Sequence, residues 1–175
     1  MVLKNDKIIL RHIQESDIEN YTKWTTVETE WQNWDAPWEW LEDNGEYLEM
    51  LKNSLNKEPT DRRLMIETVA GEHIGSVNSY YIDGDNDKLA VGIGIPPISA
   101  RGKRYGFSAL TLFLEHLFKS RDIIYTQTWS GNFPMIALAE KLGFVEIRRI
   151  RNLREVNEKK YDALTFAIAK CDWRF

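Results

Sequence analysis

The chain of 175 residues is long enough to bury the core of one domain, and 43% hydrophobic with 29% charged residues is an ordinary globular composition. No apolar run reaches the length of a membrane span, and the charged first residues differ from a secretory signal, so we expect a cytoplasmic protein without membrane partners. A pI near 5.5 and the lack of a concentrated basic face argue against a nucleic-acid partner.

The first half of the chain predicts strands with two helices inserted among them. The predicted strands are residues 7–13, a hairpin over 62–83 with its turn at 70–72, and residues 88–95 after a turn at 83–87. The first helix is expected to end near Trp24 and to have Ser16 or Asp17 as the cap of its first amides. The second, residues 45–55, places apolar side chains on one face.

The second half predicts alternating helices and strands. Helices are expected over residues 105–120 and 133–144, and strands over 123–128, 145–150 and 161–168, with a charged loop between the last two. We find no repeat, low-complexity tract or linker. The order of elements predicts a single mixed α/β domain over residues 1–175 with an antiparallel front half.

Cysteine and histidine usage gives little sign of redox or metal chemistry. Cys171 is alone, which excludes an internal disulfide and is typical of a reducing compartment, although a lone thiol can be reactive or inert. The three histidines are widely spaced and form no recognised ligand pattern, so we expect no metal. His73 follows the hairpin turn and is expected at a turn or on the surface of a strand.

A glycine-rich turn, RGKRYG, follows a double proline and precedes the helix expected at 105–120. Such a turn exposes unpaired backbone amides at the helix start, and Gly102 and Gly106 let an anion approach the main chain. The side chains of Arg101, Lys103 and Arg104 add positive charge. The segment predicts a phosphate site, and a plain helix start with surface cations is the alternative.

Two motifs together give the sequence a resemblance to a known family. RGKRYG resembles the acetyl-coenzyme A motif of the GNAT superfamily of N-acetyltransferases, with Arg104 where a glycine is usual. NFPMIALAEKLGF, residues 132–144, resembles the second signature of that family. The N-terminal KIILRHIQESDIENYTKW is similar to the ribosomal-protein-alanine acetyltransferase (RimJ/RimL-type) branch, so that the resemblance covers nearly the whole chain.

The resemblance implies a GNAT-like fold and a co-substrate, acetyl-coenzyme A, that transfers its acetyl group to a primary amine without a metal. The implied fold is a mostly antiparallel sheet that splays between two parallel strands, here 88–95 and 123–128, with helices on its faces. The pantetheine arm would pair with the backbone in the gap. The residues implied in coenzyme binding are Ile93, Gly94, Ile95, Arg101, Gly102, Lys103, Arg104, Tyr105, Gly106 and Asn132, the last of which is also a candidate helix cap.

The sequence departs from the family at its usual acid and base positions. The tyrosine that protonates the leaving thiolate in many relatives is replaced by Ala139. Met135 stands where a serine or alanine is common, and Val91 where a glutamate is common. The catalytic residues therefore stay unassigned. Candidates on the preceding hairpin are Glu67, Asn78, Tyr80 and Tyr81, each of which can equally be structural.

The acidic, tryptophan-rich segment WQNWDAPWEW, residues 31–40, has three interpretations. It lies in a stretch from Trp24 to Leu51 that holds eight acidic residues and no lysine or arginine, whereas residues 101–175 have a balance of +6. In the family this region covers the acceptor side, so it can bind a cationic amine, or else form a hydrophobic plug or a subunit interface. The residues expected to bind the acceptor are Trp34, Asp35 and Trp38, with Glu39 beside them, and Tyr80.

Three functions remain open at this point. The leading hypothesis is an acetyl-coenzyme A-dependent N-acetyltransferase that acts on a protein N-terminus or a small cationic amine, as a monomer or a homodimer. The loss of the usual tyrosine favours an alternative, a non-catalytic acyl-coenzyme A-binding sensor or scaffold. The third is an unrelated α/β domain that docks a protein through its tryptophans.

Overall fold

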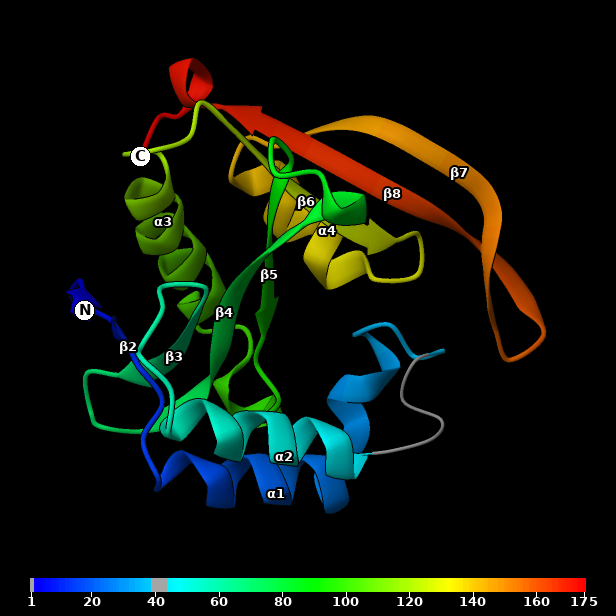
Figure 1. Cartoon of the computed structure of the whole chain (residues 1–175). Coiled ribbons are helices and arrows are strands. Elements are labelled where there is room, and N and C mark those ends of the chain that lie inside the picture. Colours follow the sequence, from blue (N-terminus) through cyan, green and yellow to red (C-terminus); the bar gives the residue numbers. More distant parts are fainter. Residues whose placement is uncertain (1, 39–43) are drawn as a thin grey trace.

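A computed structural model describes residues 2–38 and 44–175, and these form one eight-stranded sheet with helices on both faces (Figure 1). The strands are β1 (Val2–Lys4), β2 (Ile8–Arg11), β3 (Arg63–Thr68), β4 (His73–Tyr81), β5 (Leu89–Gly94), β6 (Ile123–Trp129), β7 (Val145–Val156) and β8 (Lys159–Ala169). The helices are α1 (Asp17–Thr26), α2 (Asn44–Leu55), α3 (Tyr105–Leu117) and α4 (Phe133–Lys141). The mixed α/β class expected from the sequence is confirmed.

The sheet follows the order β1-β2-β3-β4-β5-β6-β8-β7, and every neighbouring pair is antiparallel except β5 and β6. Figure 1 shows β5 and β6 in the middle of the sheet, between the β1–β4 half and the β7–β8 hairpin. The parallel pair expected from the resemblance is therefore present at the centre of the molecule.

Two hydrophobic clusters hold the layers together. The larger packs α3 and α4 against one face of the sheet through side chains such as Phe113, Leu110 and Val91. The smaller packs α1 and α2 against the other face through Tyr21, Trp24, Trp31, Leu51 and Met65. Fully burying a side chain of this size contributes about 1.5–3 kcal/mol, so each helix is fixed chiefly by its apolar face.

Three local predictions from the sequence are wrong. A short strand, β1, precedes the first predicted one, and Ser16 makes no side-chain cap at α1. The expected charged loop over 151–160 is instead the outer part of a long hairpin, since β7 and β8 pair as far as Val156 and Lys159. The strands are joined through Asn157 and Glu158, both with positive φ, which is the backbone that a two-residue hairpin turn requires.

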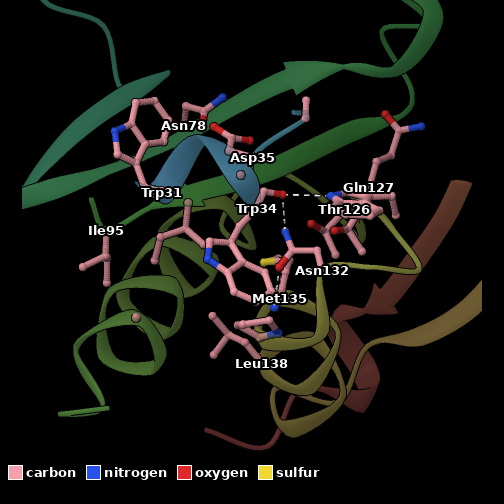
Figure 2. Close-up of a pocket in the computed structure, with 18 of the residues that line it drawn as sticks. Trp31, Trp34, Asp35, Asn78, Ile95, Thr126, Gln127, Asn132, Met135 and Leu138 are labelled. Atoms are coloured by element: carbon pink, nitrogen blue, oxygen red, sulfur yellow. Dashed lines mark hydrogen bonds between the residues drawn. The ribbon is translucent and has the colours of Figure 1, made fainter. Parts of the chain in front are cut away.

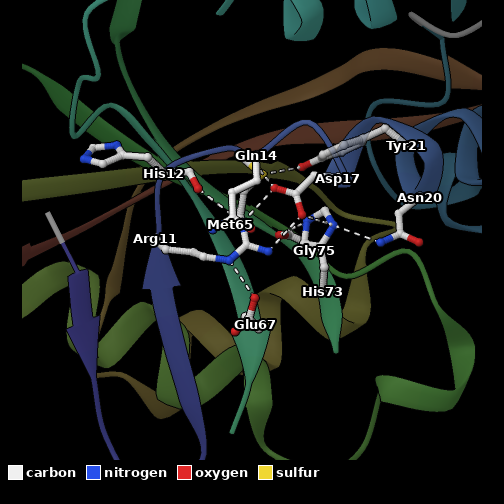
Figure 3. A network of polar contacts seen from close by, with 10 residues as sticks. All are labelled: Arg11, His12, Gln14, Asp17, Asn20, Tyr21, Met65, Glu67, His73 and Gly75. Carbon is white, nitrogen blue, oxygen red and sulfur yellow. Dashed lines mark hydrogen bonds and ion pairs between the residues drawn. The ribbon is translucent and has the colours of Figure 1, made fainter. Parts of the chain in front are cut away.

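A buried polar network fixes α1 to the sheet (Figure 3). Arg11 donates to both carboxylate oxygens of Asp17 at 2.7 and 2.8 Å, and to Glu67 at 2.6 Å. The backbone amide of Gln14 also donates to Asp17 at 2.8 Å. Burial acts to raise the pKa of the Asp17 carboxyl, but these hydrogen bonds outweigh it and hold the pKa below its ordinary value.

His73 belongs to the same network, so its expected place at a turn or on the strand surface is wrong. Its ring is buried between α1 and β4, with Nδ1 3.2 Å from Asp17 and Nε2 3.1 Å from the carbonyl oxygen of Gly75. Burial lowers the pKa of the imidazole. Nδ1 also lies 3.3 Å from the side-chain amide nitrogen of Asn20, so that α1 contacts the ring through both Asp17 and Asn20.

We predict that Asp17→Asn destabilises the fold by about 1.5–3 kcal/mol, because the Arg11 guanidinium loses the carboxylate that accepts two of its hydrogen bonds and keeps only Glu67 as an ion-pair partner. The folded-state pKa of Asp17 is depressed, so its contribution is present above about pH 4 and is lost as the pH falls further. Urea unfolding at pH 7 and pH 3 measures both effects. Glu28→Gln, at an exposed pair with Lys23, should change the free energy of unfolding by under about 1 kcal/mol.

None of the helices within residues 2–38 and 44–175 is long and apolar enough to cross a membrane.

Candidate active site

The parallel strands β5 and β6 part soon after they meet, and a large cavity runs through the gap. Their pairing has a single register, Ala90 opposite Tyr125, and the hydroxyl of Thr126 adds one hydrogen bond to the carbonyl oxygen of Val91 at 2.8 Å. Residues of both strands beyond this point line a cavity of about 1190 Å³, which includes Gly92 and Gln127. The gap thus connects the α3–α4 face of the sheet to the α1–α2 face.

The backbone of Ile93 faces this gap. The N–H and C=O groups of successive residues in a strand point to alternate sides, and the carbonyl of Val91 points to β6. Ile93, two residues later, therefore directs its own amide and carbonyl toward β6, where the two strands no longer pair. An extended ligand inserted in the gap would find an unpaired donor and acceptor there.

The RGKRYG turn forms a row of unpaired amides at the start of α3. The amide of Arg101 is bonded to Ile98, but within the described chain the amides of residues 102–107 have no hydrogen-bond acceptor. Gly102 has φ +75° and nothing within 4 Å of its Cβ position, so that the main chain is open there. Six unpaired N–H groups at the N-terminus of a thirteen-residue helix suit an anion such as a pyrophosphate.

The Arg101 side chain is already occupied by the protein. It donates to the carbonyl oxygens of Ile95 and Pro96 at 3.0 and 2.8 Å, and pairs with Glu30 at 2.6 Å. Glu30 also accepts from the indole of Trp34 at 2.7 Å. Arg101 therefore fixes the loop and the tryptophan segment, which leaves its backbone neighbours and Arg104 to face a ligand.

Asn132 and the tryptophan segment meet across the opening of the gap (Figure 2). The Asn132 side chain accepts from the amide of Met135 as the cap of α4, and donates to the carbonyl oxygen of Trp34 at 3.0 Å. Trp129 donates to the same carbonyl at 2.8 Å. The cap uses Oδ1 only, so it is compatible with the coenzyme-binding role foreseen for Asn132; one N–H of its Nδ2 is given to Trp34 and the second is left for a ligand.

The tryptophans of this segment have separate environments. Trp31 is buried against α1, and Figure 2 shows the indole of Trp34 directed into the cavity toward Ile95 and Leu138. Trp38 lies over Arg154 at 4.5 Å and edge-on to Trp129. Trp31 thus fits the interpretation of this segment as a hydrophobic plug. In contrast, the guanidinium of Arg154 stacks on one face of Trp38. Glu39 lies outside the described residues.

On the α1–α2 face, the cavity ends in a polar pocket that the sequence analysis largely missed. Three of its side chains, Tyr21, Tyr47 and Arg63, come from α1, α2 and β3. They join the expected Asp35, Asn78 and Tyr80. Tyr47 lies on the apolar face expected for the helix over residues 45–55. A cation at the first position of a strand opposite Asn78 is the signal that could have suggested Arg63.

The structure sorts the candidates named from the sequence. All the expected coenzyme- and acceptor-binding residues line the cavity except Lys103. Among the candidates for acid–base roles, Asn78 and Tyr80 line it, but Glu67 is paired with Arg11, and the Tyr81 hydroxyl accepts from Arg121. Ala139 is fully buried, so the position of the usual tyrosine offers no acid. Among the described residues, no group of three or more histidine, cysteine or acidic side chains could hold a metal ion.

Comparison with known families agrees with this geometry. The model of the acetyltransferase (GNAT) domain matches residues 7–145. The chain belongs to the GNAT acetyltransferase family. No curated protein matches the sequence significantly.

Solved structures of GNAT proteins cover nearly the whole chain. A GNAT acetyltransferase from Bacillus anthracis is 15% identical with a TM-score of 0.78, over 97% of this chain and 98% of that one. Spermidine N-acetyltransferase from Vibrio cholerae, in complex with CoA and spermine, is 20% identical with a TM-score of 0.74, over 96% and 98%. RimL, a ribosomal L7/L12 acetyltransferase in complex with coenzyme A, is 14% identical with a TM-score of 0.76, over 97% and 98%. The fold is therefore that of the GNAT family. The structural neighbours include RimL, as expected from the resemblance of the N-terminal segment to the RimJ/RimL-type branch.

The GNAT motif departs from its usual form at Arg104, where a glycine is usual and where the backbone conformation disfavours a side chain. Arg104 has φ 68°, in the left-handed region that glycine occupies without strain. We predict that Arg104→Gly raises the free energy of unfolding by about 0.5–1 kcal/mol, since relief of about 1–2 kcal/mol is partly offset by a more flexible unfolded chain. Thermal melts of Arg104→Gly and Arg104→Ala distinguish the causes: the alanine variant also loses the charge but keeps the strain, and should not be stabilised.

Proposed function

We propose that the protein is an N-acetyltransferase that transfers an acetyl group from acetyl-coenzyme A to a primary amine by direct attack on the thioester. The supporting observation is the gap between β5 and β6, which joins unpaired amides on one face of the sheet to a polar pocket on the other. The two reactants would enter from opposite faces and meet beside Ile93.

The residues present suit the coenzyme as a co-substrate. The diphosphate would lie on the amides of residues 102–107, with Arg104 beside it, and the pantetheine arm would pair with Ile93 in the gap. Gly106 faces Ile93, Ile95 and Leu138 at ordinary contact distances, so that its missing side chain leaves room in the cavity. Opening of the Trp34 contact with Asn132 would admit the thioester end.

The chemistry needs a neutral amine, an aligned thioester and a stabilised oxyanion. The amine nitrogen would attack the carbonyl carbon, and the C–S bond would break as the tetrahedral intermediate collapses, with the thiolate taking a proton. The amide of Ile93 would donate to the developing oxyanion, while its carbonyl oxygen would accept from the pantetheine arm. Alignment within the gap can contribute up to about 7–11 kcal/mol in well-oriented cases.

The amine must lose a proton, because the pKa of a free alkyl amine is about 10.4. Asp35 and Tyr80 are the titratable groups among the expected acceptor residues that line the cavity. We propose that Asp35 attracts the ammonium form and that water beside Tyr80 and Asn78 carries the proton away. Because Ala139 offers no acid, the thiolate would be protonated from water.

The comparisons bear on the acceptor only by analogy. The Vibrio cholerae neighbour is named for spermidine and RimL for a ribosomal protein, so a small amine and a protein N-terminus both remain within the proposal. The fully buried Ala139 favours the alternative, a non-catalytic acyl-coenzyme A-binding domain. A cytoplasmic location and a possible homodimer stay predictions.

We expect the wild-type protein to release coenzyme A from acetyl-coenzyme A in the presence of a suitable amine. A thiol reagent follows the release over a panel of polyamines, amino acids and N-terminal peptides. Calorimetry with coenzyme A provides the control: binding without release on any amine supports the sensor alternative, and no binding at all contradicts both.

We predict that Gly106→Ala keeps or raises stability while it weakens coenzyme A binding at least tenfold. The new methyl group lies 3.5–3.6 Å from Ile93, Ile95 and Leu138, which the folded chain tolerates, and alanine favours a helix by about 0.8–1.0 kcal/mol over glycine. The same methyl group would narrow the cavity. Thermal melts and calorimetry measure the two effects, and Ser108→Ala, in the same helix but outside the cavity, is the control. An unchanged affinity in Gly106→Ala would place the coenzyme elsewhere.

A further inference from the structure

Arg63 is a cation in the acceptor pocket without a carboxylate partner in the described chain. It is half-buried at the start of β3, where its Nη1 donates to the hydroxyl of Tyr47 at 3.0 Å. The arginines that pair with described carboxylates are Arg11, Arg101 and Arg149. Partly buried charges are normally paired, because transfer from water costs more than hydrogen bonds to neutral groups return.

The two tyrosines around Arg63 do not supply the missing charge. The hydroxyls of Tyr47 and Tyr21 both face its guanidinium. Burial raises the pKa of each hydroxyl, so both stay protonated and neutral at physiological pH. Tyr47 orients the guanidinium by hydrogen bonding, and no ion pair joins Arg63 to a carboxylate within the described chain.

The position of Arg63 directs that charge toward the reaction centre. Its Cα lies opposite Asn78 on β4, and Asn78 lies opposite Gly92 on β5, so that the three residues form one row across the sheet. Directly opposed residues share a face of the sheet, and here it is the face covered by α1 and α2. Gly92 leaves room for the Asn78 amide, since a Cβ there would lie 2.9 Å from its Oδ1. The row ends next to Ile93, where the thioester would lie.

We propose that the acceptor carries an oxyanion, a carboxylate or a phosphate, in the same molecule as its amine, and that Arg63 binds it. This rests on the acetyltransferase function proposed above and specifies its substrate class. Asp35 lines the same cavity and lies on the same side as Asn78 in Figure 2. The pocket thus offers one negative and one positive group, which matches an amino acid, an acidic N-terminal peptide or an aminoalkyl phosphate. A polyamine has no group for Arg63.

Matched pairs of amines test the proposal. The pairs are tyrosine and tyramine, the C-terminally amidated peptides Ser-Glu and Ser-Gln, and phosphoethanolamine and ethanolamine, with kcat/KM measured by coenzyme A release. The wild-type protein should prefer the anionic member of at least one pair by tenfold or more, and the pair that shows it tells carboxylate from phosphate. Arg63→Met should abolish that preference, a loss of about 30-fold or more for the anionic member, since truncating one partner of a buried charge pair costs at least 2 kcal/mol.

Two further variants separate charge from folding. Arg63→Lys keeps the charge but not the forked geometry, and should retain part of the preference. Arg62→Met removes an arginine at the adjacent position, which is exposed, stacks on Tyr81 and does not line the cavity. It should leave the preference unchanged. A wild-type protein that shows no anion preference in any pair, or an Arg63→Met variant that keeps it, overturns the proposal.

Direct binding distinguishes failure of this inference from failure of the proposed function. Calorimetric titration of the three anionic amines into wild-type protein and Arg63→Met, each with and without coenzyme A, does not depend on turnover. Arg63-dependent binding supports the anion site even where no amine is acetylated, and its absence contradicts it. A lack of coenzyme A binding, in contrast, contradicts the acetyltransferase proposal.

Discussion

The junction between β5 and β6 is the constraint on which the rest of this structure depends. Two parallel strands that continued side by side would satisfy each other's backbone groups and leave a closed sheet. Here one registered pair and one threonine hydroxyl join them, after which they separate. Separation leaves unpaired groups in the centre of the sheet, a position where backbone polar atoms are normally satisfied. The cavity and the access from both faces follow from it.

The protein partly satisfies the open junction by itself. The carbonyl of Trp34 accepts from Trp129 and Asn132 on one side of the gap, while Glu30 links the same segment to Arg101 on the other. The segment that follows α1 therefore ties together the two halves of the sheet where their strands do not. Any ligand that fills the gap exchanges these contacts for its own, so the net affinity is the difference between the two sets.

The sequence predicted the fold well because its signals were local and repeated. Apolar periodicity predicted α2 and α3, cap and terminating residues predicted α1 and α4, and turn residues predicted the β3–β4 hairpin. The β7–β8 extension was missed because its turn uses Asn157 and Glu158 in place of a glycine, and its charged, exposed residues resemble a loop. On the α3–α4 side, the lining of the cavity was predicted from the RGKRYG turn and from the resemblance to the GNAT motifs, whose residues follow one another along the chain. Tyr21, Tyr47 and Arg63 come from three separate elements, and only the register of the sheet and the packing of α1 and α2 unite them. No motif or spacing in the sequence predicts that these three side chains lie in one pocket.

Asp17 lies one helical turn before Tyr21 in α1, and its pair with Arg11 holds the start of this helix against the sheet. The same ion pair therefore helps to position Tyr21, which lines the pocket. A change at this anchor would tilt the tyrosine without contacting any ligand. Variation that broadens or shifts the range of amines accepted can therefore arise among residues 11–17, one helical turn away from the pocket wall on the same face of α1. Directed evolution of this scaffold would do well to randomise that stretch alongside the pocket itself.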